Sequence, residues 1–524
     1  MKKLVLTACF AGTAAIALVF YSFTKSKPIG KNADTISVEG GKISGVKGNE
    51  SDVTAYKGIP FAAPPVGDLR WKAPQPIVPW TGVKKCDAFG PSPMQAVPKP
   101  FMVYTSEFLI PEQPISEDCL YLNVWTNAHK GAKHPVFLWI YGGGFSSGGT
   151  SVPIYDGEAM AKKGVIFVSA NYRVGVFGFL AHPDLTKESP NHASGNYGLL
   201  DQIAALKWIK KNIAAFGGDP NNITIDGQSA GSMSVNCLVA SPAAHGLFNK
   251  AIAESGSFMV ANPLIQSITL EMAEEQGSKF AESAHAQSIQ ELRNMPPTDL
   301  MKIPGRFSPI TDGYVLPKPV YQVFAEGAQN NVPVITGWNA DESFVMSFKK
   351  KDAYVEQIKK QFGADADEVL KYYPGNTDEE AARSQVKMSR DQTFAMSGFK
   401  WISLQSQQGK APIYVYNFDR KLPATPDYVK YGAFHTGEVA YVMDDLKFLK
   451  RPWEPADQPL ATLMSSYWVN FIKTGNPNGQ GLPEWPKYDN STQQAMVFDA
   501  TSGKQTLPDK DALKFMVERV EAGK

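Results

Sequence analysis

The chain lacks a charge imbalance. Its 524 residues carry 52 Lys and Arg against 51 Asp and Glu, which gives a formal net charge of +1. Proteins that bind nucleic acid or an anionic membrane surface through their overall field carry an excess of basic residues. The balance therefore excludes a strongly basic nucleic-acid-binding protein, and we expect no nucleic-acid partner.

Cysteine and histidine are scarce, with four and seven residues. They show none of the His/Cys spacings that are typical of metal sites, so we expect no metal and no cofactor. Long Pro/Gly/Ser linkers and internal repeats are also missing. Residues 36–524 are therefore predicted to form one domain with insertions, although the length alone would allow more than one.

A long uncharged apolar run lies at the N-terminus. Met1-Lys2-Lys3 is basic, and Leu4–Phe23 follows without a charge. Residues 1–27 are thus predicted to be a secretory signal or an uncleaved membrane anchor, in which residues 4–23 would form the tether. The run is long for a cleaved signal and has no clear cleavage site, so both alternatives stay open. Either one predicts export, to the periplasm or the medium.

Export permits disulfide bonds. Beyond Cys9, which lies in the export segment, three cysteines remain. A bond between Cys86 and Cys119 would close a loop of about 33 residues and stabilise the fold by roughly 3–4 kcal/mol. Cys237 lies in the apolar stretch NCLVAS and is expected to be a buried free thiol. We expect the Cys86–Cys119 disulfide; the alternative that all three cysteines are unpaired stays open.

Six short apolar runs predict buried parallel strands. They do not alternate apolar with polar residues, which is typical of strands that are covered on both faces. Helix-like segments such as Asp201–Phe216 separate several of them. The pattern predicts an α/β protein with a large, mostly parallel central sheet flanked by helices. The runs are Val136–Ile140, Val165–Ser169, Ile223–Ile225, Ala251–Ala253, Val332–Gly337 and Ile413–Phe418.

The sequence contains two Gly-x-Ser-x-Gly motifs, centred on Ser229 (GQSAG) and Ser146 (GFSSG). A nucleophilic serine of this kind needs a strand before it and a helix after it. Ser229 follows the run Ile223–Ile225 and precedes MSVNCLVAS, which is free of Gly and Pro, whereas Ser146 leads into GGTSVP. Ser229 is therefore the candidate nucleophile.

The region around Ser146 has another predicted use. Tyr141-Gly142-Gly143-Gly144-Phe145 directly follows a predicted strand, and residues without side chains let backbone N–H groups approach a ligand closely. A serine hydrolase needs such donors for the oxyanion that forms during the reaction. We expect the N–H groups of Gly143, Gly144 and Ala230, the residue after the nucleophile, to form this oxyanion hole.

Together these features make the sequence similar to the type B carboxylesterase family, the branch of the α/β-hydrolases that also contains the cholinesterases. The resemblance implies an α/β-hydrolase fold and the hydrolysis of carboxylic esters. The matching stretches are YKGIPFAAPPVGDLRW (Tyr56–Trp71), SEDCLYLNVW (Ser116–Trp125), YGGGFSSG (Tyr141–Gly148), NYRVGVFGFL (Asn171–Leu180), the stretch from Gly195 to Ser232, and TGNPN (Thr474–Asn478).

The base and the acid follow from chain order, which in α/β-hydrolases runs serine, acid, histidine. His435 is the only histidine beyond His285, and the family's Gly-x-x-His pattern falls on it. The residues alone leave Asp341 and Glu342 open as the acid. The resemblance favours Glu342, because the family's acid is the second of an Asp-Glu pair followed by Gly or Ser.

The loop between Cys86 and Cys119 bears on the substrate. It contains Phe101, Tyr104 and Phe108 but no tryptophan, whereas the cholinesterase relatives use a tryptophan there to face the choline cation. Gln228 also stands where those relatives carry a glutamate. These aromatic residues and Phe145 favour small to medium apolar or aromatic esters over choline esters.

The sequence therefore predicts a serine carboxylic-ester hydrolase that works through an acyl-serine intermediate on a small-molecule ester. The alternatives are a non-catalytic binding or adhesion module on the same fold, and an acyltransferase or lipase variant.

Overall fold

The computed structural model describes residues 35–48, 51–260, 268–345, 347–426 and 428–523. The predicted signal or anchor over residues 1–27 lies outside them. Among the described residues, no helix combines the length and the apolar composition needed to cross a membrane.

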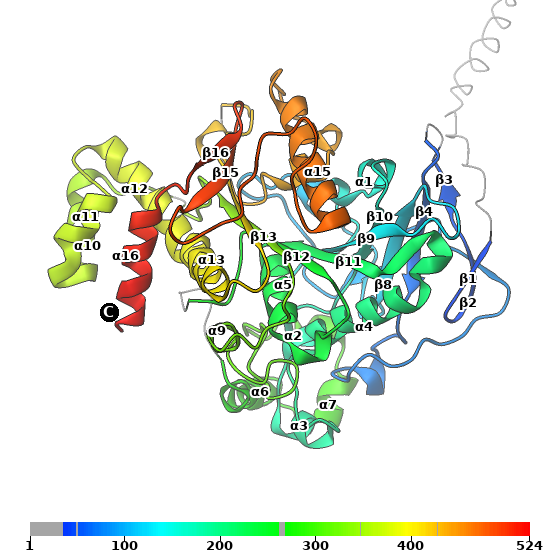
Figure 1. Ribbon diagram of the computed structural model, residues 1–524. Coiled ribbons are helices and arrows are strands. Elements are labelled where there is room, and N and C mark those ends of the chain that lie inside the picture. The colour runs from blue at the N-terminus through cyan, green and yellow to red at the C-terminus, as the bar shows by residue number, and fades with distance from the viewer. Residues whose placement is uncertain (1–34, 49–50, 261–267, 346, 427, 524) are drawn as a thin grey trace, which may run out of the picture.

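An 11-stranded sheet runs across the molecule in the order β16-β15-β14-β13-β12-β11-β9-β10-β8-β4-β3 (Figure 1). Its strands are β3 (Val46–Lys47), β4 (Thr54–Pro60), β8 (Tyr121–Thr126), β9 (His134–Ile140), β10 (Ile166–Ala170), β11 (Gly218–Gln228), β12 (Lys250–Glu254), β13 (Val334–Asn339), β14 (Ile413–Phe418), β15 (Gln494–Phe498) and β16 (Gly503–Thr506).

All six predicted strands are present and form the centre of this sheet. Each of the neighbouring pairs from β10 through β9, β11, β12 and β13 to β14 is parallel. Every residue of β10, β12, β13 and β14 is buried, as continuous apolar runs require. The predicted α/β architecture is confirmed. Antiparallel pairing occurs only towards the edges, where β3, β4 and β8 lie at one side and β16 at the other.

Helices cover both faces of the sheet (Figure 1). On one face α4 and α5 pack against β11, and α13 packs against β13 and β14; on the other, α1 contacts β8 and β10, and α15 contacts β9 and β11. The helices are α1 (Glu158–Lys162), α2 (Gly175–Phe179), α3 (Pro183–Glu188), α4 (Tyr197–Asn212), α5 (Ala230–Ala240), α6 (Leu270–Ser283), α7 (Ile289–Asn294), α8 (Pro297–Leu300), α9 (Val320–Ala325), α10 (Lys351–Phe362), α11 (Ala366–Tyr372), α12 (Asp378–Arg390), α13 (Met396–Gln408), α14 (Val439–Val442), α15 (Asp457–Thr474) and α16 (Lys510–Glu521).

The helix predicted over Asp201–Phe216 starts earlier, at Tyr197, and its last residues form a 3-10 turn before Gly217. Gly217 adopts φ +85°, the left-handed conformation in which helices commonly end. Asp201 of this helix is fully buried and forms an ion pair of 2.7 Å with Arg173. Arg173 also donates to Asp201 through its backbone N–H. The pair therefore fixes the segment after β10 to α4.

The structure does not contain the Cys86–Cys119 disulfide that was expected from the sequence. Both residues, like Cys237, are free cysteines buried in the main hydrophobic cluster. Burial raises the pKa of the Cys86 thiol to about 12 and that of Cys119 well above its ordinary value, so both stay neutral thiols that pack as small apolar side chains. The core around them is built without the bond, and the prediction of Cys237 as a buried free thiol is confirmed.

Parallel strands end at the same edge of a sheet, and loops at that edge carry the sites of α/β proteins. Here the loops after β9, β11, β13 and β14 contain the glycine run, Ser229, Glu342 and His435 in that order. The fold thus brings four distant parts of the chain to one edge.

Candidate active site

Ser229 occupies a sharp turn between β11, which ends at Gln228, and α5, which begins at Ala230. Its backbone has φ 59° and ψ −123°, a conformation that costs free energy for a residue with a side chain. Its N–H donates to the carbonyl of Glu254, at 2.8 Å, which ties the turn to β12. The strained turn leaves Ser229 partly accessible between buried neighbours.

Two glycines make this turn possible. A Cβ on Gly227 would lie 2.5 Å from the carbonyl carbon of Gly231, and a Cβ on Gly231 would lie 2.0 Å from the carbonyl oxygen of Ile140. Both positions therefore need glycine, because α5 crosses close to β11 and β9. The other motif serine, Ser146, instead donates to the carbonyl of Gly143, at 3.2 Å.

The glycine run after β9 packs directly against the turn. A Cβ on Gly142 would lie 2.9 Å from the Cβ of Ser229. Gly143 adopts φ +115° and Gly144 φ +62°. Their N–H groups donate to no other described residue, so they are available to a ligand beside Ser229. Both glycines line the same cavity as Ser229 and Ala230.

His435 lies in the loop after β14 and is fixed from several sides. Its Nδ1 is 3.1 Å from Oε1 of Glu342, which is fully buried. The hydroxyl of Tyr104 donates to the carbonyl of His435, at 3.0 Å. The ring of Phe394 stacks on the imidazole, with centroids 4.3 Å apart and an interplanar angle of 15°. Phe394 comes from a π-helical turn between α12 and α13, a feature with no signal in the sequence.

Asp341 and Glu342 have different partners. Oδ2 of Asp341 accepts the N–H of Ala433, at 2.9 Å, and the side chain is partly accessible. Of the two acids, only Glu342 contacts the imidazole. The residues alone left both acids open, and the family resemblance favoured Glu342. The structure places Glu342, and not Asp341, beside His435.

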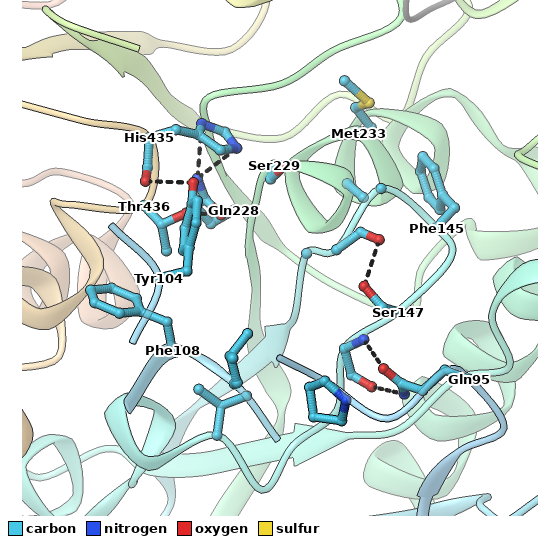
Figure 2. A pocket seen from close by; sticks show the side chains of 18 of the residues that line it. Gln95, Tyr104, Phe108, Phe145, Ser147, Gln228, Ser229, Met233, His435 and Thr436 are labelled. Carbon is cyan, nitrogen blue, oxygen red and sulfur yellow. Dashed lines mark hydrogen bonds between the residues drawn. The ribbon is translucent and has the colours of Figure 1, made fainter. Parts of the chain in front are cut away.

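Gln228 is the last residue of β11, and its side chain reaches the histidine. Its Nε2 is 3.3 Å from Nδ1 and 3.4 Å from Nε2 of His435, and Thr436 Oγ1 donates to its Oε1, at 3.3 Å. Within the described part of the chain, no hydrogen bond joins Ser229 Oγ to the imidazole. Both side chains face the same cavity (Figure 2), and such contacts often tighten only when substrate is bound.

This active-site cavity has a volume of about 380 Å³, within the range typical of small-molecule sites. Phe101, Tyr104, Phe108 and Phe145, expected from the sequence, all line it. Four further lining residues, which were not expected from the sequence, come from other parts of the chain: Phe258, Phe344, Phe394 and Arg306. No Asp or Glu is among its described lining residues, and Arg306 is their one permanently charged side chain.

Three further acids lie buried behind the site: Asp226 on β11, Glu254 on β12 and Glu438 after His435. Burial raises the pKa of Glu438 to about 8, with the charge of Glu342 adding to the effect, and raises the pKa values of Asp226 and Glu254 well above their ordinary range. The indole N–H of Trp468 donates to Glu254 Oε1, at 2.9 Å. In the described part of the chain, no group of His, Cys, Asp and Glu residues has the arrangement of a metal site.

Known proteins resemble this chain over nearly its whole length. The profile of the carboxylesterase family matches residues 32–516. A fumonisin B1 esterase of Sphingopyxis macrogoltabida is 37% identical over 519 residues, covering 94% of this chain and 92% of that protein. A para-nitrobenzyl esterase of Bacillus subtilis is 35% identical, covering 89% and 94%, and carboxylesterase 1C of Rattus norvegicus is 32% identical, covering 89% of each. The chain therefore belongs to the carboxylesterase family, with the α/β-hydrolase fold, and is a carboxylic-ester hydrolase.

Proposed function

We propose that Ser229 is the nucleophile, His435 the general base and Glu342 the acid that orients the imidazole. One observation carries the proposal: Ser229 stands on a strained turn in the same cavity as His435, whose Nδ1 lies 3.1 Å from buried Glu342. Ser229 Oγ attacks the ester carbonyl while His435 takes its proton, and Glu342 stabilises the imidazolium. The alcohol leaves with that proton, and water, activated by His435, then releases the acid from the serine.

The N–H groups of Gly143, Gly144 and Ala230 hold the oxyanion in this mechanism. The support is that the first two are without hydrogen-bond partners in the described chain and that all three residues line the cavity beside Ser229. Ala230 is the first residue of α5, so its N–H has no carbonyl within the helix. Donors fixed in advance stabilise the developing charge without reorganisation.

The substrates are small to medium esters with apolar or aromatic groups. The support is the volume of about 380 Å³ and the aromatic lining of the active-site cavity. A chain as long as palmitate would extend beyond such a space. Activity towards short acyl chains should therefore exceed activity towards long ones.

The first test is the hydrolysis of p-nitrophenyl esters from acetate to palmitate by the wild type, Ser229→Ala and Ser146→Ala. We expect short-chain activity in the wild type, a loss of at least about 10⁴-fold in Ser229→Ala, and near-normal rates in Ser146→Ala. A folded Ser229→Ala protein that keeps its activity would refute the assignment of the nucleophile.

We further propose that the protein is exported, to the periplasm or the medium, through residues 1–27. The support is the basic Met1-Lys2-Lys3 followed by the uncharged run Leu4–Phe23. Cell fractionation with activity assays tests the export, and N-terminal sequencing of the mature protein distinguishes a cleaved signal from a retained anchor. Activity confined to the cytoplasm would contradict the proposal.

A further inference from the structure

A second cavity, which we call the basic chamber, adjoins the active-site cavity. It has a volume of about 460 Å³. Tyr104, Phe344 and His435 line both cavities. These three residues therefore form the boundary between the two spaces, and none of the glycines beside Ser229 lines the chamber.

Four basic side chains and one acid line the basic chamber: Arg383, Lys387, Lys421, Lys430 and Asp341. Asp341 accepts the N–H of Ala433. Arg383 pairs with Glu379 and Lys387 with Asp509, at 2.6 and 2.7 Å. No described residue forms an ion pair with Lys421 or Lys430. The two lysines without an ion pair, Lys421 and Lys430, thus outnumber the one acid in the chamber lining, Asp341. Asp419, outside the lining, lies close enough to Lys421 for the lysine to act on the pKa of its carboxyl.

Apolar side chains are exposed in the same chamber. Phe344, Phe348 and Val429 line it with exposed fractions of 43%, 48% and 59%. Large exposed apolar side chains that gather at one cavity indicate a binding site. Their mixture with lysines suits a ligand that has an apolar body and an anionic end.

We propose that the basic chamber binds a carboxylate on the leaving-group side of the ester, so that the enzyme prefers esters of alcohols or phenols that carry a carboxylate. The inference rests on the proposed function, in which His435 gives its proton to the leaving oxygen. The leaving group then lies on the histidine side of the scissile bond, where the chamber begins.

The active-site cavity supports the same conclusion. A carboxylate beside the nucleophile would repel an anionic substrate, yet Gln228, next to Ser229, is an uncharged amide. No acidic side chain lines this cavity among the described residues, and Arg306 lines it. An anionic ester therefore meets no negatively charged side chain among the described lining residues of the active-site cavity.

The test compares 4-butyryloxybenzoate with 4-butyryloxybenzamide, two esters of the same shape whose leaving groups differ in charge. For the wild type we expect a KM about fivefold lower for the benzoate than for the benzamide. This preference should weaken as ionic strength rises, because salt screens exposed charges. In Lys421→Gln/Lys430→Gln the ratio of the two KM values should fall to about 1.

Two further double variants distinguish a local effect of the chamber lysines from an effect of the protein's overall charge. Lys359→Gln/Lys360→Gln removes the same charge from the exposed face of α10 and should keep the wild-type ratio. Lys421→Arg/Lys430→Arg should also keep it, because the charge stays in the chamber. Equal KM values for both esters in the wild type, or the same ratio in both Lys→Gln double variants, would overturn the inference while leaving the proposed function intact. Hydrolysis of neither ester would refute the proposed function and, with it, this inference.

Discussion

At the scale of single residues, burial and partners separate two adjacent acids. Glu342 is fully buried and faces the imidazole, whereas Asp341 is partly accessible and accepts a backbone N–H. A buried carboxylate beside a histidine stabilises the imidazolium that forms during acyl transfer. A carboxylate that binds a backbone N–H at the loop surface has no such role.

Glu342→Gln should therefore lower kcat by about 10²- to 10⁴-fold, because the amide no longer stabilises the positive charge on His435. Asp341→Asn should stay within about tenfold of the wild type, since its carbonyl oxygen can still accept the N–H of Ala433. Steady-state kinetics with a short p-nitrophenyl ester measures both. A larger loss in Asp341→Asn would reverse the assignment of the acid.

At the scale of elements, the turn between β11 and α5 depends on close backbone contact. Helix α5 starts so near β9 that Gly231 lies against the carbonyl of Ile140. Neighbouring backbone can move little, because β9 is paired on both sides, with β10 and β11. The conformation of Ser229 thus depends on packing of the helix against the sheet.

We expect Gly231→Ala to lower the free energy of unfolding by about 2–4 kcal/mol and to reduce activity strongly, because its Cβ would lie 2.0 Å from a backbone oxygen. Gly503→Ala on β16 is the matched control: no heavy atom lies within 4 Å of the added Cβ, and its effect should stay below about 1 kcal/mol. Urea denaturation compares the two. Equal stability of both variants would show that the turn can relax.

At the scale of the whole molecule, the buried acids make stability depend on pH. Glu438, Asp226 and Glu254 are completely buried, and burial raises the pKa of each. For Glu438 the folded-state pKa is about 8 against an ordinary value of 4.5. Between these values the folded protein holds a proton that the unfolded chain has lost. The contribution of Glu438 to the free energy of unfolding is therefore largest below about pH 4.5 and is lost as the pH rises through about 8.

The melting temperature should accordingly fall between pH 6 and pH 9. Glu438→Gln, which keeps an oxygen to accept from Asn339 but cannot ionise, should fall less steeply over the same range. Thermal unfolding of both proteins in buffers of constant ionic strength provides the measurement. Parallel curves for the two would remove Glu438 as a cause.

Much of this protein was predictable from local sequence. Continuous apolar runs predicted all six central strands, because strands buried on both faces leave no place for polar residues. The strand-turn-helix context distinguished Ser229 from Ser146, since the requirement for glycine is local to the backbone. Chain order and family resemblance led to His435 and Glu342.

Other features depend on contacts between segments far apart in the chain, and only the tertiary structure decided them. Phe394 reaches His435 because a π-helical turn aims it there, and the buried acids meet only because β11, β12 and the loop after β14 converge. Cys86 and Cys119 had a spacing compatible with a bond, but both are free buried thiols. Spacing limits which residues can meet; packing, burial and the charges of neighbouring elements decide which ones do.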